Sequence, residues 1–310
     1  MRCLVLGGGG FIGSHLCDQL IAEGHEVRIF EKVRLSRANI LHLEDRIEWI
    51  EGDFLNPECL RAVAKDIEII FHLISSTLPK DSNDNPVYDV ASNVIPSINL
   101  LDAARDAGVR KVILASSGGT VYGIPRTVPI SEGHATEPIC SYGIHKLMIE
   151  KYLALYYKLY GLDYAVIRIS NPYGERQRLS GNQGVIPIFI NKALRGETIE
   201  IWGDGTVVRD YLHISDVVRA AVMMMGITAP QKIVNIGSGV GLSLNELLEE
   251  IRQVVGLDLR VQYTSRRPFD VPANILDISL AKKVIGWVPR VDLVSGLKRT
   301  MQYVEGLRKR

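Results

Sequence analysis

Tyr142 and Lys146 stand four residues apart in the segment SYGIHKLMIEKYL. In a helix, this spacing places both side chains on the same face. A nearby cation favours the ionised form of a phenol, and it therefore lowers the tyrosine pKa from its usual value of about 10. A tyrosine tuned in this way takes a proton from a hydroxyl group and returns it. The pair predicts acid–base chemistry on an alcohol.

The segment LVLGGGGFIGSHL near the start of the chain contains a glycine-rich turn, which helps to interpret the tyrosine–lysine pair. Gly7, Gly10 and Gly13 follow an apolar segment and open a predicted helix. Such glycines let the backbone approach a pyrophosphate closely, and the helix N-terminus offers it unpaired N–H groups. A dinucleotide site is therefore favoured over a merely flexible turn. With the tyrosine–lysine pair, it indicates alcohol–ketone chemistry on a nicotinamide.

Acidic residues after the second and third predicted strands indicate which dinucleotide binds. Glu31 ends the second strand, where a carboxylate accepts hydrogen bonds from the adenosine ribose and repels a 2′-phosphate. NAD is therefore expected, although Lys32, Arg34 and Arg37 provide positive charge nearby, either for a phosphate or as a solvated loop. Asp53 follows the third strand and would hold the adenine amine or serve as a turn residue.

Composition narrows the class of protein. The chain has 310 residues, of which 46% are hydrophobic, so a sizeable core is possible. A net charge of +1 argues against nucleic acid or a membrane surface as the main partner. The four cysteines are widely spaced, which predicts no metal site and free thiols in the cytoplasm. Because residues 1–6 lead straight into the glycine loop, we expect no signal peptide, and no apolar run is long enough to cross a bilayer.

Short apolar segments alternate with helix-length amphipathic stretches, a pattern typical of α/β proteins with a parallel sheet. Strands are predicted at 2–6, 26–30, 47–50, 67–72, 110–116 and 163–169, and helices at about 12–23, 86–107 and 141–160. We expect a dinucleotide-binding domain over 1–171 with a returning segment at about 207–256. A smaller C-terminal substrate lobe is expected from 172–206 and 258–310.

Several motifs occur in a fixed order along the chain. After the glycine loop and Asp53 come SSGGTVYG at 116–123, YGIHK at 142–146, RISNPYG at 168–174, GDGTVVRDYLHISDV at 203–217 and RRPFDVPANILD at 266–277. Over essentially its whole length the chain resembles the extended short-chain dehydrogenase/reductases, and more narrowly the UDP-glucose/UDP-N-acetylglucosamine 4-epimerases. The resemblance implies a modified Rossmann, doubly wound sheet with NAD. It also implies a homodimer formed through the helices at about 86–107 and 141–160.

The resemblance also implies roles for individual residues. Tyr142 would be the acid/base, and Lys146 would in addition hold the nicotinamide ribose. Further cofactor contacts would come from Phe11, Ile12, Asp53, Phe54, Leu73, Ile74, Ser75, Asn93 and Ser170. Substrate contacts would come from Asn171, Val185, Trp202, Arg209, Arg267, Asp270 and Asn274. Three of these have structural alternatives: a salt bridge of Arg209 with Asp210 or Asp216, a packing role for Trp202, and a solvent-facing loop position for Asn274.

One position departs from the family pattern. The family has a serine or threonine four residues before the tyrosine of the VYG turn, where its hydroxyl group contacts the sugar. That position is Gly118 here. Because alternate residues of a strand point the same way, Thr120 is the first candidate to replace it, and Ser117 is the second. In the family, a position shortly after the Arg-Arg-x-x-Asp motif helps to decide whether an N-acetyl group fits. The resemblance places Asn274 there, and because asparagine is smaller than tyrosine, it implies a pocket that accepts N-acetylated sugars.

The resemblance implies NAD-dependent 4-epimerisation of a UDP-hexose through a transient 4-keto sugar. A UDP-glucuronate 4-epimerase remains an alternative. A nucleotide-sugar 4,6-dehydratase is disfavoured, because Gly119 and Thr120 replace the Asp-Glu pair of those relatives. Glu31 disfavours an NADP-dependent keto-reductase. A non-catalytic NAD-binding scaffold or sensor is disfavoured because Tyr142 and Lys146 are both present.

Overall fold

A computed structural model describes residues 1–79, 81–179, 184–228, 230–265 and 271–308. The chain divides into two compact units. Unit 1 consists of Met1–Gly123, Ala135–Arg168 and Val218–Val234, and unit 2 of Ile124–His134, Ile169–Val217 and Asn235–Arg310. The segment predicted to return to the main sheet, about 207–256, is longer than the Val218–Val234 segment that belongs to unit 1.

A seven-stranded sheet forms the centre of unit 1, in the order β10-β6-β5-β4-β1-β2-β3. Pairing is parallel between β1 and β2, β2 and β3, β1 and β4, and β4 and β5. The strand order reverses between β1 and β4, and in such sheets ligands bind beyond the carboxyl ends of the strands at that point. The expected doubly wound sheet is therefore confirmed. The strands are β1 Arg2–Leu6, β2 Glu26–Glu31, β3 Ile47–Glu51, β4 Ile69–His72, β5 Lys111–Ser117, β6 Asp163–Ile169 and β10 Ile233–Ile236.

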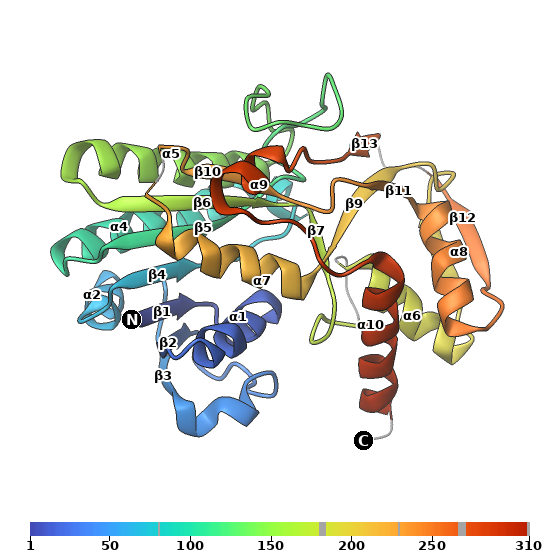
Figure 1. The fold of residues 1–310 in the computed structure, drawn as a ribbon, viewed down its shortest axis with the longest axis horizontal. Coiled ribbons are helices and arrows are strands. Elements are labelled where there is room, and N and C mark those ends of the chain that lie inside the picture. The colour runs from blue at the N-terminus through green and yellow to red at the C-terminus, as the bar shows by residue number, and fades with distance from the viewer. Residues whose placement is uncertain (80, 180–183, 229, 266–270, 309–310) are drawn as a thin grey trace. The chain divides into compact units, whose positions relative to one another are not determined.

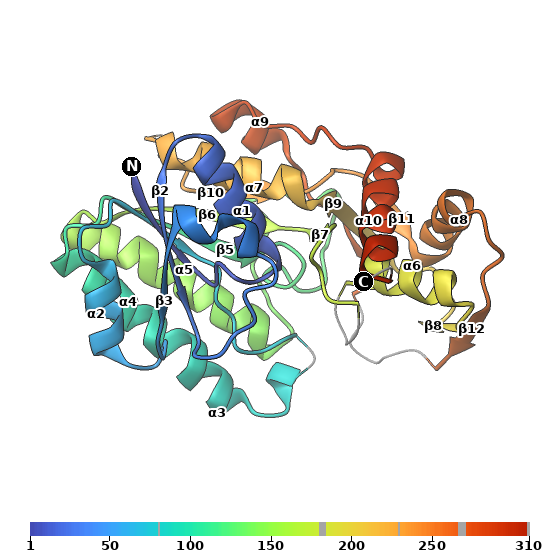
Figure 2. The same cartoon turned by 90° about the horizontal axis from the view of Figure 1, so that it is seen from below.

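Helices cover both faces of this sheet. Figures 1 and 2 show α4 and α5 on one face and α1 on the other. The predicted helix at 86–107 is interrupted by a π-helical turn at Val90–Val94. The helices are α1 Phe11–Ala22, α2 Pro57–Ala64, α3 Pro86–Asp89, α4 Ile95–Asp106, α5 Ser141–Tyr160 and α7 Ile214–Met223, with 3₁₀ turns at Leu41–Arg46, Asp81–Asn83 and Met224–Gly226.

The core of unit 1 explains why its strands are almost entirely apolar. A parallel sheet is covered on both faces, so its strands form continuous hydrophobic runs instead of alternating ones. Leu4, Ile70 and Val112 from three neighbouring strands are completely buried, and Leu100 of α4 and Leu153 of α5 pack into the same cluster. This packing holds α5, which carries the tyrosine–lysine pair, against the sheet.

Unit 2 combines two small sheets with a group of helices. Strand β9 pairs with β7, β11 and β13, while β8 pairs with β12. Helices α6, α8 and α10, which Figure 1 shows as ribbons, share one apolar cluster in which Ile190, Leu247 and Leu297 are completely buried. The elements are β7 Asn171–Tyr173, α6 Val185–Arg195, β8 Ile199–Trp202, β9 Val208–His213, β11 Gly241–Ser243, α8 Leu244–Val255, β12 Val261–Thr264, β13 Ala273–Asn274, α9 Ser279–Ile285 and α10 Leu293–Arg308. Among the described residues, no helix is long and apolar enough to cross a membrane.

Candidate active site

The first turn of α5 is capped by side chains from a distant segment. The first N–H groups of a helix have no partner within the helix, and the N-cap residue Cys140 makes no side-chain capping bond. Instead, the Ser141 N–H donates to Asn83 Oδ1 at 2.9 Å, and the Tyr142 N–H donates to Ser82 Oγ at 3.0 Å. The 3₁₀ turn at Asp81–Asn83 therefore fixes the backbone at Tyr142.

Tyr142 and Lys146 lie together on α5, as their spacing predicts. The Lys146 Nζ is 5.6 Å from the centroid of the Tyr142 ring. It also donates to the Ala115 carbonyl oxygen in β5, at 3.1 Å. Lys146 is only 2% exposed, so its charge acts in surroundings of low dielectric constant.

The acid–base properties of the pair differ from the prediction. Burial raises the pKa of Tyr142 to about 12, and a hydrogen bond with Ser75 only partly opposes this increase. Burial lowers the pKa of Lys146 to about 8, while the carboxylates of Glu150 and Asp89 oppose that decrease. The predicted lowering of the Tyr142 pKa is therefore wrong, because the loss of hydration around the phenol is the largest effect and raises this pKa. At neutral pH the chain itself holds a neutral phenol beside a charged ammonium group.

Thr120 lies next to the start of α5. A Cβ atom added at Gly143 would be 2.7 Å from the Thr120 carbonyl oxygen, so only glycine allows this close approach. The Thr120 Oγ1 is buried and makes no hydrogen bond with any residue that the structure describes. Ser117 has a backbone role, because its carbonyl oxygen accepts the N–H groups of Thr120 and Val121 at 3.3 and 3.1 Å. Of the two candidates for the hydroxyl group missing at Gly118, Thr120 is thus the one whose buried hydroxyl needs a partner.

The glycine loop connects β1 to α1 in a turn that side chains would obstruct. Gly7 has a φ of +88°, and a Cβ atom at Gly13 would lie 2.1 Å from the Gly7 carbonyl oxygen. The Gly10 N–H donates to the same oxygen at 3.2 Å. Phe11 and Ile12 follow in the first turn of α1. The loop is therefore a tight turn without side chains, and it leads directly into the N-terminus of α1.

Glu31 lies at the end of β2, beside this loop. Its Oε1 accepts the Gly9 N–H at 3.1 Å, and its Oε2 accepts the Lys32 N–H at 3.2 Å. The side chain is buried, and burial raises the pKa of its carboxyl group although both hydrogen bonds oppose this. The carboxyl group is therefore fixed against the loop backbone, where the ribose of a dinucleotide is expected.

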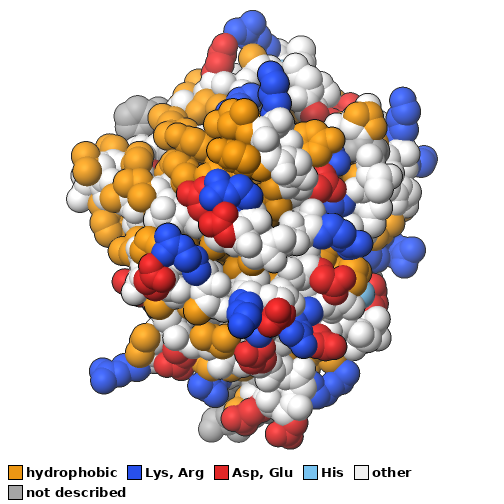
Figure 3. All heavy atoms as spheres, turned by 90° about the vertical axis from the view of Figure 1, so that its left-hand side faces the viewer, with side chains coloured by type: hydrophobic (Ala, Val, Ile, Leu, Met, Phe, Trp, Pro, Cys, Tyr) orange, Lys and Arg blue, Asp and Glu red, His pale blue; other side chains and the backbone are white. Residues whose placement is uncertain are grey.

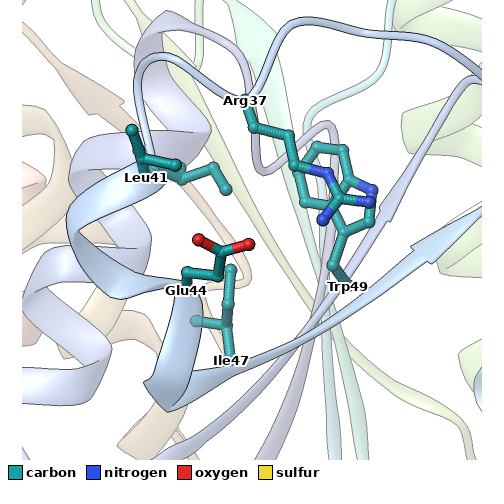
Figure 4. A pocket seen from close by; sticks show the side chains of 6 residues that line it. Arg37, Leu41, Glu44, Ile47 and Trp49 are labelled. Carbon is teal, nitrogen blue, oxygen red and sulfur yellow. The ribbon is translucent and has the colours of Figure 1, made fainter.

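Among the basic residues after β2, Arg37 has partners within its own loop and strand. Figure 4 shows the Arg37 guanidinium group lying against the indole of Trp49, and its carbon is 4.8 Å from the ring centroid. Arg37 Nη2 is 3.4 Å from Glu51 Oε1, which also accepts the Trp49 Nε1–H at 3.1 Å. The Arg34 N–H donates to the other oxygen of Glu51 at 3.4 Å. Glu51 thus contacts both Arg37 and Trp49 through the same oxygen.

The segment that follows β4 runs alongside the glycine loop. The Leu73 N–H donates to the Leu6 carbonyl oxygen at 3.1 Å. Ile74 approaches Gly7, since a Cβ atom there would be 3.5 Å from Ile74. The Asn93 Oδ1 accepts the Ser76 N–H at 2.8 Å and so holds this backbone in place.

Asp53 and Phe54 lie just after β3. The Asp53 Oδ1 accepts the Leu55 N–H at 2.9 Å, an arrangement typical of a turn aspartate. Phe54 packs against His72, with ring centroids 5.4 Å apart. A role for Asp53 in holding adenine stays a prediction.

In unit 2, three predicted substrate residues lie on adjacent strands. Asn171 belongs to β7, Arg209 to β9 and Asn274 to β13; β9 pairs with both other strands, and Asn274 stands opposite Arg209. Arg209 Nη1 donates to the Val271 carbonyl oxygen at 2.7 Å. Asn171 Nδ2 donates to the Asp210 carbonyl oxygen at 3.1 Å. Asn274 is 1% exposed, so a solvent-facing position is wrong.

Asp210 and Asp216, the two alternative salt-bridge partners of Arg209, both accept hydrogen bonds from backbone N–H groups. Asp210 accepts hydrogen bonds from the Ser238, Gly239 and Leu276 N–H groups, and Asp216 accepts them from Arg290 and Val291. Both aspartates therefore organise the backbone of unit 2.

The remaining predicted residues lie elsewhere in unit 2 or outside the residues that the structure describes. Val185 begins α6 and Trp202 ends β8. The Ser170 Oγ is buried and, among the described residues, has no hydrogen-bond partner. Arg267 and Asp270 lie outside the described residues.

Known proteins resemble this chain closely. The model of the NAD dependent epimerase/dehydratase family matches residues 3–237. The chain belongs to this family. It is 38% identical to a putative UDP-glucose 4-epimerase of Methanocaldococcus jannaschii, over 97% of this chain and 98% of that protein. It is 39% identical to the UDP-glucose 4-epimerase of Mycolicibacterium smegmatis, over 98% of each chain. The crystal structure of the Thermotoga maritima UDP-glucose 4-epimerase with UDP-glucose superimposes with a TM-score of 0.95, at 36% identity, over 99% of this chain and 100% of that one.

The residues of this family member fit NAD. The glycine loop has no room for side chains at Gly13, and Glu31 presents a buried carboxyl group beside it. Lys146 uses one of its three N–H donors on Ala115. Gly7, Gly10 and Gly13 would hold the pyrophosphate, Glu31 the adenosine ribose and Lys146 the nicotinamide ribose.

Sequence reasoning missed several buried polar residues around the pair. Glu150, one turn after Lys146, pairs with Arg168 at 2.6 Å. The ring of His145 lies 4.9 Å from that of Tyr142, and His145 pairs with Asp89. The spacing of Lys146 and Glu150 was a usable signal, whereas nothing local relates Asp89 to His145.

Proposed function

We propose that this protein is an NAD-dependent UDP-hexose 4-epimerase. The observation that carries the proposal is the placement of Tyr142, Lys146 and the buried Thr120 hydroxyl around the start of α5, in the unit that carries the dinucleotide loop. The epimerase names of relatives at 38% and 39% identity support it.

Three side chains of unit 1 would handle the proton of the sugar 4-hydroxyl. Tyr142 in its phenolate form takes this proton, becomes a phenol, and returns the proton from the same oxygen, while the Thr120 hydroxyl hydrogen-bonds to the substrate. Lys146 keeps a positive charge beside the phenol. When bound, NAD supplies the hydride acceptor for carbon 4 and a further positive charge, which favours ionisation of a phenol whose pKa is about 12.

We assign nucleotide-sugar binding to unit 2 and cofactor binding to unit 1. Epimerisation requires firm anchoring of the nucleotide, which arginine provides through bidentate contacts with phosphate, and a sugar that can turn. Arg209, Asn171 and Asn274 on their adjacent strands are the described candidates. Asn274 is buried and smaller than tyrosine, which supports acceptance of N-acetylated sugars.

Product analysis tests this function. The purified protein is incubated separately with UDP-glucose, UDP-N-acetylglucosamine and UDP-glucuronate, and the nucleotide sugars are then separated. We expect the protein to convert UDP-glucose to UDP-galactose. We also expect it to convert UDP-N-acetylglucosamine, and the Asn274→Tyr substitution should lower the rate of this second conversion more than that of the first. Conversion of UDP-glucuronate alone would favour the uronate epimerase. A 4-keto-6-deoxy product would indicate a dehydratase, and bound NAD without any conversion would indicate a scaffold or sensor.

We also propose a homodimer formed through α3, α4 and α5. Exposed apolar side chains occur on all three helices, namely Val87, Tyr88, Ile95, Ile144, Leu155, Tyr157, Leu159 and Tyr160. Figure 3 shows hydrophobic side chains gathered on the face where α4 and α5 end. Burial of this surface against a second copy would remove it from water. Sedimentation equilibrium of the wild type and of Ile95→Glu tests this: a dimer that becomes a monomer is expected, and a monomeric wild type would contradict it.

We place the enzyme in the cytoplasm. Its four cysteines form no disulfide bond, and Cys3 and Cys17 are buried in the core of unit 1. Free thiols are typical of a reducing compartment. Fractionation of the source cells would test this placement.

A further inference from the structure

A buried polar pair stands beside Tyr142. His145 Nδ1 is 2.9 and 3.0 Å from the two carboxylate oxygens of Asp89, and the two residues are 1% and 0% exposed. Asp89 also accepts hydrogen bonds from Ser141 Oγ at 2.7 Å, from Asn93 Nδ2 at 3.2 Å and from Thr77 Oγ1. Both oxygens of the Asp89 carboxylate are thus fully engaged by donors.

These bonds fix the state of the imidazole. Although burial raises the pKa of Asp89, the hydrogen bonds hold it below its usual value, so the group is a carboxylate and only accepts hydrogen bonds. The His145 Nδ1 must therefore carry the hydrogen. Burial and the charge of Lys146 lower the pKa of His145 to about 4, so the ring is neutral near pH 7. The buried Nε2 has no hydrogen-bond partner among the described residues.

The fixed ring contacts the acid/base residue. The rings of His145 and Tyr142 meet edge-on, with centroids 4.9 Å apart and an interplanar angle of 66°. Such aromatic contacts are directional and contribute energy beyond the burial of area. Asp89 lies at the end of α3, and the Ser141 hydroxyl bonded to it lies at the start of α5. The pair therefore joins the segment before α4 to the turn of α5 that carries Tyr142.

We propose that His145 is a positioning residue for Tyr142: Asp89 holds the imidazole through Nδ1–H, and the imidazole ring holds the phenol in its reactive orientation. This inference rests on the proposed epimerase function. In well-ordered active sites, displacement of a reacting group by about 1 Å lowers the rate by about a hundredfold. Loss of the ring should therefore lower kcat without weakening substrate binding.

Two substitutions separate the functions of the His145 side chain. His145→Asn keeps an N–H donor for Asp89 and removes the ring, whereas His145→Phe keeps a ring and removes the donor. The measurements on NAD-loaded protein are kcat and KM for UDP-glucose, the bound NAD content and the melting temperature. A merely structural role predicts that activity follows the melting temperature in both variants.

We expect His145→Asn to melt near the wild type, retain NAD, and lose about tenfold or more in kcat with KM within about twofold. His145→Phe should melt at a lower temperature, because Asp89 loses a donor, yet retain a higher kcat than His145→Asn. If His145→Asn keeps wild-type kcat, or if His145→Phe loses as much kcat as His145→Asn, the inference is overturned. Inactivity of the wild type toward every UDP-hexose would instead contradict the proposed function.

Discussion

The backbone N–H of Tyr142 donates to the hydroxyl oxygen of Ser82, 3.0 Å away. The two residues are 60 positions apart in the chain. The position of the Tyr142 backbone therefore depends on a turn that precedes α3, and not only on α5.

Ser82→Ala tests this dependence. The substitution leaves the Tyr142 N–H without its acceptor, and we expect a loss of about 1 kcal/mol in the free energy of unfolding together with a lower kcat. Ser243→Ala is a matched control, because Ser243 caps α8 in unit 2 by accepting the Glu246 N–H. Urea denaturation and turnover of UDP-glucose measure both effects. Equal kcat in the two variants would show that the Ser82 bond has no influence on the site.

Much of unit 1 could be predicted because its signals are local. Apolar runs bounded by turns gave β1 at 2–6 and β6 at 163–169 with the bounds that the structure has. The glycine spacing located the turn between β1 and α1. Parallel strands that are buried on both faces leave a clear signal in the sequence.

Features that depend on distant partners could not be predicted in this way. The π-helical turn within 86–107 coincides with Asn93, whose side chain holds the backbone of Ser76. The contact of His145 depends on Asp89, which lies 56 residues earlier. The sign of the Tyr142 pKa shift depends on burial, which the spacing of Tyr142 and Lys146 does not reveal.

The ionisation of Lys146 should make the kcat/KM of the enzyme depend on pH. Burial lowers the pKa of Lys146 to about 8. Because a lysine is charged below its pKa, its positive charge is present at pH 7 and is lost as the pH rises through about 8. We expect kcat/KM to fall over that range. The arginine in Lys146→Arg stays charged at all these pH values. The kcat/KM of this variant should be lower than that of the wild type, but it should not decrease as the pH rises through about 8. The same decrease in Lys146→Arg would contradict the assignment to Lys146.

The buried ion pair of Glu150 and Arg168 should be important for folding. Arg168 Nη2 and Nε lie 2.6 and 3.1 Å from the carboxylate oxygens of Glu150, which also accepts the Ser116 hydroxyl. Glu150→Gln leaves Arg168 without its counter-ion, and we expect a loss of about 3 kcal/mol in the free energy of unfolding. The double variant Glu150→Leu with Arg168→Met should recover most of this loss, because it removes both charges.

Urea denaturation would measure these differences. Glu249→Gln is the control, because the pair of Glu249 with Arg252 is about half exposed, and it should lose much less stability. A loss in Glu150→Gln no larger than in the control would contradict this prediction.

Glu31 should determine the preference for NAD over NADP. Its carboxyl group is fixed beside Gly9, and Arg37 is held by Trp49 and Glu51. Glu31→Ser removes the repulsion of a 2′-phosphate, so NADP should bind about tenfold more tightly or better. Adding Glu51→Gln should release Arg37 and strengthen NADP binding further. Dissociation constants of both cofactors, measured on protein freed of cofactor, check this. An unchanged ratio in both variants would assign the preference to other residues.

In the proposed mechanism, the Tyr142 hydroxyl carries the proton of the sugar. Tyr142→Phe removes this one oxygen and keeps the ring that packs against His145. The most direct measurement is the rate of conversion of UDP-glucose to UDP-galactose by Tyr142→Phe protein with its NAD content verified. We expect this rate to fall by about a thousandfold or more at unchanged NAD content. Conversion at the wild-type rate would contradict it.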